Sequence, residues 1–159
     1  MYIYSTIKIK KMKLKHLKPI LGICVLLLAI SCKVEPQPID YGKDQCSFCK
    51  MNVVDKTHAA QYVTAKGKQF KFDAIECMVN DLNENNEANI AILLVANYGN
   101  PGEMIDATTA TFLISKEIKS PMGANLSAFS SKIKAEELKQ KHGGAIFTWE
   151  TLKQKFSDK

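Results

Sequence analysis

Apolar and polar residues alternate in the first half of the chain in a way that predicts a strand, a turn and a second strand. Residues 58–65 alternate over a length typical of a strand. Residues 68–72 then place Phe70 and Phe72 on one face of the next strand, because successive side chains of a strand point to opposite sides. The intervening residues 66–67, Lys-Gly, are typical of a turn.

The pattern changes to a helical one directly after this strand pair. Apolar residues recur at the spacing of one helix face, at Ile75, Met78, Val79 and Leu82. Asp73 is placed as an N-cap, with Glu76 three residues on as in a capping box, and the polar residues 83–86 end the helix. Residues 90–96 form a continuous apolar run typical of a buried strand. The order of the first half is therefore β-β-α-β.

The second half repeats this order after the chain break at residues 97–102. Strands are expected at 106–115, 125–130 and 145–149, with helices at 134–142 and 150–156, and Gly143-Gly144 caps the first of these helices. We therefore predict an α+β fold of two related β-β-α-β units packed together. The units span about 45–98 and 103–157 within a domain at 45–157.

The N-terminal residues have the features of an export signal. Lysines precede an apolar run of 12 residues at 19–30, which is shorter than the roughly 20 residues that span a membrane as a helix. Ser31-Cys32 follows and resembles a lipobox, although Ala29 occupies the place usually held by Leu. We predict a lipoprotein signal peptide at 1–31, lipidation at Cys32, and a Pro-containing flexible tether at 32–44.

The net charge of +6 does not indicate nucleic-acid binding, because it comes from the leader. Six of the 22 lysines precede Cys32, and the remainder of the chain has 16 lysines against 16 acidic residues. The chain also lacks arginine, the usual side chain for contacts with phosphate and guanine. We therefore expect a membrane surface, reached through the lipid, rather than a nucleic acid as the partner.

Cysteines are the first candidates for chemistry. Of the five, Cys24 leaves with the signal and Cys32 takes the lipid, so that Cys46, Cys49 and Cys77 remain. An odd number of thiols in an exported domain argues against a simple disulfide framework. Either at least one thiol is free, or a metal ion uses them.

The segment Cys46-x-x-Cys49-x-Met51 favours a copper(I) site. In extended backbone Cys49 and Met51 point the same way, and a turn lets Cys46 reach the same ion. Thiolates and a thioether are soft ligands that prefer Cu(I). Zinc usually takes four ligands from two such pairs, and the sequence has no second CxxC motif.

Other residues and other uses of the CxxC pair stay open. Met122 and Cys77 are further candidate ligands, whereas Met78 is more typical of the core, and His58 is expected to be exposed. Lys50 follows the pair where haem attachment requires histidine, which excludes that use. A thioredoxin-like dithiol and a structural disulfide between Cys46 and Cys49 both remain alternatives.

Several motifs in a fixed order resemble the NosL family of copper lipoproteins. They are the CxM loop, Phe-x-Phe-Asp before a helix carrying Cys-Met, Pro-Met-Gly followed by Ser-Ala-Phe, and Gly-Gly before Trp-Glu-x-Leu, and they cover residues 46–152. The resemblance implies two related β-β-α-β units, Cu(I) binding, and delivery of copper to nitrous oxide reductase outside the cytoplasm. The family's Cys-x-Met falls on Cys49 and Met51, and Cys46 is an addition to it.

The functional expectation is a metallochaperone without catalytic activity of its own. The protein would be extracytoplasmic, lipid-anchored to a bacterial membrane, and would pass Cu(I) to an exported copper enzyme. The sequence shows no convincing Ser/His/Asp set, phosphate loop or carboxylate pair for hydrolysis. The alternative is a periplasmic thiol-disulfide oxidoreductase that uses Cys46 and Cys49.

Overall fold

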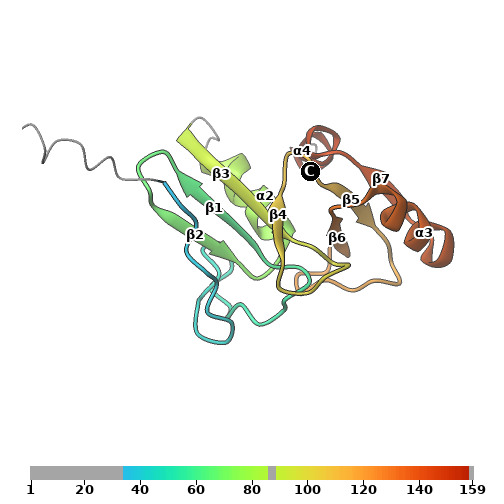
Figure 1. The fold of residues 1–159 in the computed structure, drawn as a ribbon, viewed down its shortest axis with the longest axis horizontal. Helices are drawn as coiled ribbons and strands as arrows, with labels where there is room; N and C mark the ends of the chain where they lie inside the picture. Colours follow the sequence, from blue (N-terminus) through green and yellow to red (C-terminus); the bar gives the residue numbers. More distant parts are fainter. Residues whose placement is uncertain (1–33, 86–88, 158–159) are drawn as a thin grey trace, which may run out of the picture. The chain divides into compact units, whose positions relative to one another are not determined.

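Two antiparallel sheets and three helices form the part of the chain that the computed structural model describes, residues 34–85 and 89–157 (Figure 1). The predicted signal peptide and the lipidation site Cys32 lie outside the described residues. The predicted α+β class and the β-β-α-β order of both halves are confirmed. Within the described ranges, no helix has the length and apolar character that crossing a membrane requires.

The first sheet has the strand order β2-β1-β3-β4. Its strands are β1 (Ala60–Thr64), β2 (Gln69–Phe72), β3 (Ile90–Ala96) and β4 (Met104–Asp106). The hairpin pairs Tyr62 with Phe70, whose rings stack with centroids 4.6 Å apart. Helix α2 (Ile75–Asn85) connects β2 to β3 and packs on β1 and β2. The apolar stripe predicted from helical spacing is therefore the face that α2 buries.

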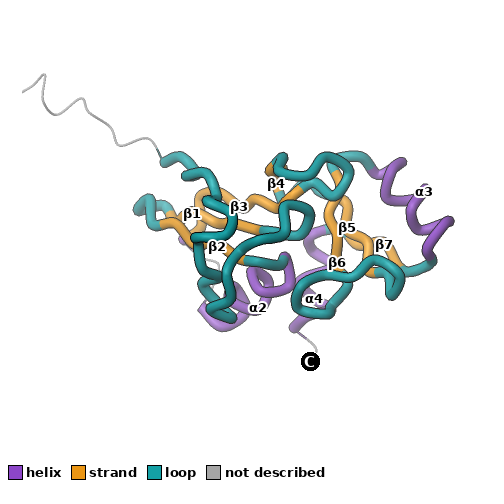
Figure 2. The backbone as a smooth tube through the Cα atoms, turned by 90° about the horizontal axis from the view of Figure 1, so that it is seen from below, coloured by secondary structure: helices purple, strands orange, loops and turns teal. Residues whose placement is uncertain are grey.

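The second sheet has the order β6-β5-β7 and carries the two remaining helices. Its elements are β5 (Thr111–Ile114), β6 (Leu126–Phe129), α3 (Lys132–His142), β7 (Ala145–Phe147) and α4 (Trp149–Ser157). Figure 2 shows α2 and α4 side by side, with α3 at the far end of the molecule. One apolar core joins the two halves, since Phe72, Phe112 and Trp149 belong to the same buried cluster.

The single strand predicted at 106–115 is wrong, because this stretch contributes to both sheets. β4 ends at Asp106 and pairs with β3, whereas β5 begins at Thr111 and pairs with β6. Between them the Asp106 carboxylate accepts hydrogen bonds from the backbone N–H of Thr108, at 2.8 Å, and from its hydroxyl. Such a local side-chain bond turns the chain, which the apolar pattern alone does not reveal.

Residues 35–44 contact the domain along the strands β1 and β2. The side-chain amide of Gln69 donates to the carbonyl of Glu35, and that of Gln61 donates to the carbonyl of Gln37. Ile39 and Tyr41 are partly buried against Val53, Ala59 and Ala96. The ordered domain thus begins before the predicted start at residue 45, and this part of the predicted tether follows its surface.

The predicted glycine cap of α3 is confirmed and provides a stability test. Gly143 has φ 68° and its N–H bonds to Lys139, and a Cβ there would meet nothing within 4 Å. Gly144 has φ 109°, and a Cβ there would lie 2.2 Å from the carbonyl oxygen of Ile114 in β5.

We expect Gly144→Ala to lower the free energy of unfolding by about 3 kcal/mol, because the clash adds to the unfavourable φ. The neighbouring Gly143→Ala should cost only about 1 kcal/mol, from its φ alone. Urea denaturation of the two variants measures both effects. Equal losses for the two variants would contradict the packing of Gly144 against β5.

Candidate metal centre

A tight loop between Gln45 and Asn52 holds all three of the main predicted ligands, Cys46, Cys49 and Met51. An isolated bridge pairs Gln45 with Asn52, and the N–H of Cys46 donates to the carbonyl of Met51 at 2.7 Å. Inside the loop the N–H of Lys50 donates to the carbonyl of Cys46 at 3.1 Å. Lys50 has φ 68°, in the left-handed region, so the premise of an extended backbone from Cys49 to Met51 is wrong.

Backbone N–H groups point at the sulfur atoms of both cysteines in this loop. The N–H of Cys49 lies 3.5 Å from Cys46 Sγ, and the backbone of Asp73 also bonds to this sulfur. The backbone of Met51 bonds in the same way to the thiol of Cys49. Because N–H donors favour the charged form of an acceptor, these bonds act to lower the pKa of both thiols and so favour the thiolate form that ligates metals.

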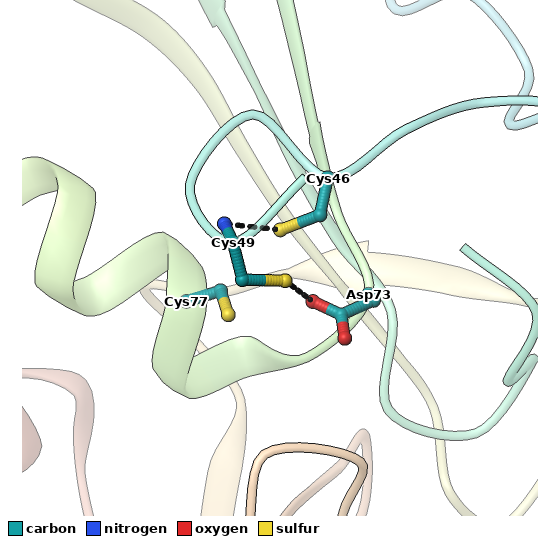
Figure 3. A group of neighbouring side chains, drawn as sticks. All are labelled: Cys46, Cys49, Asp73 and Cys77. Atoms are coloured by element: carbon teal, nitrogen blue, oxygen red, sulfur yellow. Dashed lines mark hydrogen bonds between the residues drawn. The ribbon is translucent and has the colours of Figure 1, made fainter. Parts of the chain in front are cut away.

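The beginning of α2 brings two further donors to the loop. Sulfur atoms of Cys46, Cys49 and Cys77 and a carboxylate oxygen of Asp73 all lie within 4.8 Å of one another (Figure 3). Asp73 directly follows β2, and Cys77 lies in the first turn of α2. The three thiols are free, and both Cys46 and Cys77 are 1% exposed. The structure thus assembles a three-thiol, one-carboxylate cluster.

The predicted N-cap role of Asp73 is wrong, because its side chain contacts this cluster. The helix begins at Ile75, and the N–H groups of Cys77 and Met78 bond to the backbone carbonyl of Ala74. The Asp73 carboxylate instead accepts a hydrogen bond from the thiol of Cys49, at 3.3 Å. Its other oxygen, Oδ2, is buried without a hydrogen-bond partner among the described residues. A buried carboxylate oxygen without a donor is costly, and a cation would remove that cost.

The three thiols have unequal acidities. A hydrogen bond from the thiol of Cys77 lowers the pKa of Cys46 to about 6, against the opposing effect of burial. Burial, with contributions from Cys46 and Asp73, raises the pKa of Cys49 to about 11. The hydrogen bond to Cys46, together with burial, raises the pKa of Cys77 well above its ordinary range. Without a metal, the cluster therefore holds one thiolate, on Cys46, at neutral pH.

The methionine candidates fall into two groups. Met78 is fully buried in the core, as its position on the apolar stripe of α2 predicted. Met51 and Met122 are instead 53% and 42% exposed, among the few large apolar side chains on the surface of the described residues. Met51 lies in the same 45–52 loop as Cys46 and Cys49, and its side chain is exposed to solvent.

A buried glutamate holds the loop that carries Met122 against α2. Glu76 is 3% exposed and precedes Cys77. Its Oε1 accepts hydrogen bonds from the hydroxyl of Ser120 and, at 3.2 Å, from the N–H of Ala124. The Pro-Met-Gly segment is thereby attached to the same turn of helix that supplies Cys77.

The expectation that His58 is exposed is wrong. Its side chain is 3% exposed, with Nδ1 2.8 Å from Asp55 Oδ2 and Nε2 3.2 Å from Ser127 Oγ. This arrangement resembles a catalytic triad in its partners, but Ser127 is completely buried and inaccessible to a substrate. The histidine instead connects the loop before β1 to β6, and so joins the two halves.

The fold and the cluster together define a two-sheet α+β domain with a partly exposed, sulfur-rich group of side chains that could hold a metal ion. The NosL family model matches residues 38–157, so the chain belongs to the NosL family. The copper-binding lipoprotein NosL of Stutzerimonas stutzeri is 28% identical over 122 residues, which is 72% of this chain. The chain spans 64% of that relative's length.

A solved structure has the same fold. The copper chaperone NosL from Shewanella denitrificans matches with a TM-score of 0.66 and 20% identity, over 74% of this chain and 95% of that one. Both sheets and their helices are therefore an arrangement already seen in a NosL protein.

The shifted thiol acidities predict a pH-dependent ultraviolet absorbance in the metal-free, reduced protein. Thiolate absorbance should appear with a midpoint near pH 6, because the lowered pKa of Cys46 keeps its thiol ionised above that pH. Cys46→Ser should remove this step, and Cys77→Ala should move it upward by removing the stabilising hydrogen bond. Cys49→Ser serves as the comparison and should keep a step below neutral pH. Thiolate absorbance that appears only around the ordinary thiol pKa of about 8.5 would contradict the lowered pKa of Cys46.

Proposed function

We propose that this protein binds Cu(I) at its thiol cluster and delivers the ion to an exported copper enzyme, without catalytic activity of its own. The observation that carries the proposal is the gathering of the thiols of Cys46, Cys49 and Cys77 beside exposed Met51. Thiolate and thioether sulfur are the ligands that Cu(I) prefers. Membership of a family with a copper-binding lipoprotein and a copper chaperone among its relatives supports the same metal.

Cys46 and Cys49 with Met51 remain the proposed ligands, and Cys77 joins them. The buried thiols of Cys46 and Cys77 supply fixed donors, because they pack in the hydrophobic core. Cys49 is only partly buried and Met51 is exposed, so these two form the accessible side of the site. Met122, on the loop attached to α2 through Glu76, is proposed as an additional exposed sulfur rather than a fixed ligand.

This gradation of exposure suits transfer from one protein to another. A client sulfur or imidazole can approach the ion from the side of Met51 while Cys46 still holds it. The ion then changes partners by ligand exchange and is never released to water. We propose nitrous oxide reductase as the client, in keeping with the family.

The oxidoreductase alternative requires an accessible, acidic nucleophile. In dithiol oxidoreductases the attacking cysteine is exposed and has a lowered pKa. Here the acidic thiol, Cys46, is 1% exposed, whereas the more exposed Cys49 has a raised pKa of about 11. This combination disfavours rapid disulfide exchange and supports the metal-binding function.

The first test of the proposal is Cu(I) affinity, measured by competition with a chromophoric Cu(I) chelator under reducing conditions. Cys49→Ala should weaken binding by more than about 100-fold, beyond the usual cost of losing a residue that only orients a ligand. Met51→Ala should weaken it by about 10-fold. Val54→Ala is the control, since it shortens another exposed apolar side chain of the same region and should change nothing. Unchanged affinity in Cys49→Ala would refute the site.

The second test separates delivery from redox catalysis. Cu(I)-loaded protein is mixed with copper-free nitrous oxide reductase, and copper transfer and enzyme activity are followed together. We expect direct transfer that Met51→Ala slows by about 10-fold, and negligible disulfide exchange on a generic dithiol substrate. Rapid dithiol turnover that is insensitive to Met51→Ala, with no copper transfer, would establish the oxidoreductase instead.

We also propose that Cys32 carries lipid and anchors the protein outside the cytoplasm to a bacterial membrane, either facing the periplasm or at the outer membrane. The support is the charged and apolar leader that ends at Ser31-Cys32. Cys32→Ala should abolish incorporation of labelled fatty acid and release the protein into the soluble fraction, because several acyl chains are what makes such anchoring durable. A variant that stays on the membrane after high-salt washing would mean that another segment anchors the protein.

A further inference from the structure

The cluster contains one donor that copper(I) chemistry does not explain. The carboxylate of Asp73 is 2% exposed and lies among three thiols, and its Oδ2 has no hydrogen-bond partner in the described part of the chain. Carboxylate oxygen is a hard ligand and a poor one for Cu(I), whereas zinc-class divalent ions accept both thiolate and carboxylate. The Cys-x-Met loop alone would not need this residue.

We propose that Asp73 and Cys77 complete a four-donor site for a divalent ion of the zinc class, and that Asp73 determines whether such an ion competes with Cu(I). In this proposal, Cu(I) uses sulfur ligands only, while the divalent ion uses Cys46, Cys49, Cys77 and Asp73 together. This inference rests on the proposed function, because the divalent ion and Cu(I) would bind to the same thiols.

The separations of the donors suit a tetrahedral ion. A metal–sulfur distance of about 2.3 Å places tetrahedral ligand atoms about 3.8 Å apart. All four donor atoms already lie within 4.8 Å of one another, so closure requires movements of about 1 Å or less. The donors also come from two parts of the chain, the 45–52 loop and residues 73–77 at the junction of β2 and α2, so that an ion among them would have ligands from both (Figure 3).

The charge balance favours a divalent ion when all four donors bind. Three thiolates and one carboxylate carry four negative charges, so a divalent ion leaves a net charge of −2, the same as in a four-cysteine zinc site. A monovalent ion would leave −3 in a mostly buried cluster. A Cu(I) ion is therefore better served by sulfur ligands with the carboxylate left out of its coordination.

Cobalt(II) is the probe that tests this, because its spectrum reports both geometry and the number of thiolates. The full chain, purified in detergent and reduced, is titrated with Co(II), then with Zn(II) in competition. Intense visible bands of tetrahedral Co(II) and a strong sulfur-to-metal charge-transfer band are expected. Cys77→Ser should lose about a third of the charge-transfer intensity, since two of three thiolates remain.

Asp73→Asn is the decisive variant. It should keep the charge-transfer band but weaken Co(II) and Zn(II) binding by about 10- to 100-fold, while Cu(I) affinity changes by less than about threefold. The retained Cu(I) binding also shows that the variant is folded. Asp81→Asn is the matched control, because this buried α2 carboxylate bonds to the Tyr62 hydroxyl outside the cluster, and it should leave all three affinities unchanged.

The possible outcomes separate this inference from the proposed function. An octahedral Co(II) spectrum without thiolate bands, or Zn(II) affinity that is unaffected by Asp73→Asn, would overturn the four-donor site. An equal loss of Cu(I) and Zn(II) affinity in Asp73→Asn would overturn the selective role of Asp73. A parent protein that binds Co(II) tetrahedrally but does not bind Cu(I) would instead overturn the copper function.

Discussion

The contact between Cys46 and Cys77 is the constraint on which the rest of the site depends. Both thiols are 1% exposed and belong to the same core cluster as Phe72 and Leu152. The hydrophobic core therefore fixes the distance between the thiol loop and the beginning of α2. Because folding of the core positions these donors, metal binding requires little reorganisation of the chain.

Solvent exposure of the sulfur-bearing side chains increases outward from this buried contact. Cys46 and Cys77 lie in the core, Cys49 is at its edge, and Met51 reaches solvent. The left-handed φ of Lys50 is what separates the last two, since it turns the chain between Cys49 and Met51. A site with fixed inner ligands and accessible outer ones can retain an ion and still present it to a partner, which a fully buried cluster cannot do.

The sequence predicted the elements well because their signals are local. Alternation in β1 and β2, helical spacing in α2 and the glycines after α3 all act over a few residues. The misassigned stretch 106–115 depends on a side-chain turn at Asp106 that hydrophobicity does not report. The contacts of residues 35–44 with β1 and β2 are equally invisible, since they join residues more than twenty positions apart.

The site was predictable only in part, because local sequence patterns do not report contacts between residues that are distant in the chain. Cys46 and Cys49 form a motif within four residues, whereas Cys77 and Asp73 reach it through the tertiary fold. Asp73 had a sufficient local explanation as a helix cap, and its spacing of four residues from Cys77 was the one signal that could have linked it to the thiols. His58 likewise forms its buried hydrogen bond with Ser127, which lies 69 residues away along the chain.

The most direct test of the central claim is X-ray absorption at the copper edge of the Cu(I)-loaded protein. We expect a monovalent edge and an inner shell made of sulfur alone, with two or more scatterers from the thiol cluster. Replacing Cys46 by serine should lower the sulfur count by one. An inner shell dominated by nitrogen or oxygen, or a shell that is unchanged in the Cys46→Ser protein, would contradict copper binding at this cluster.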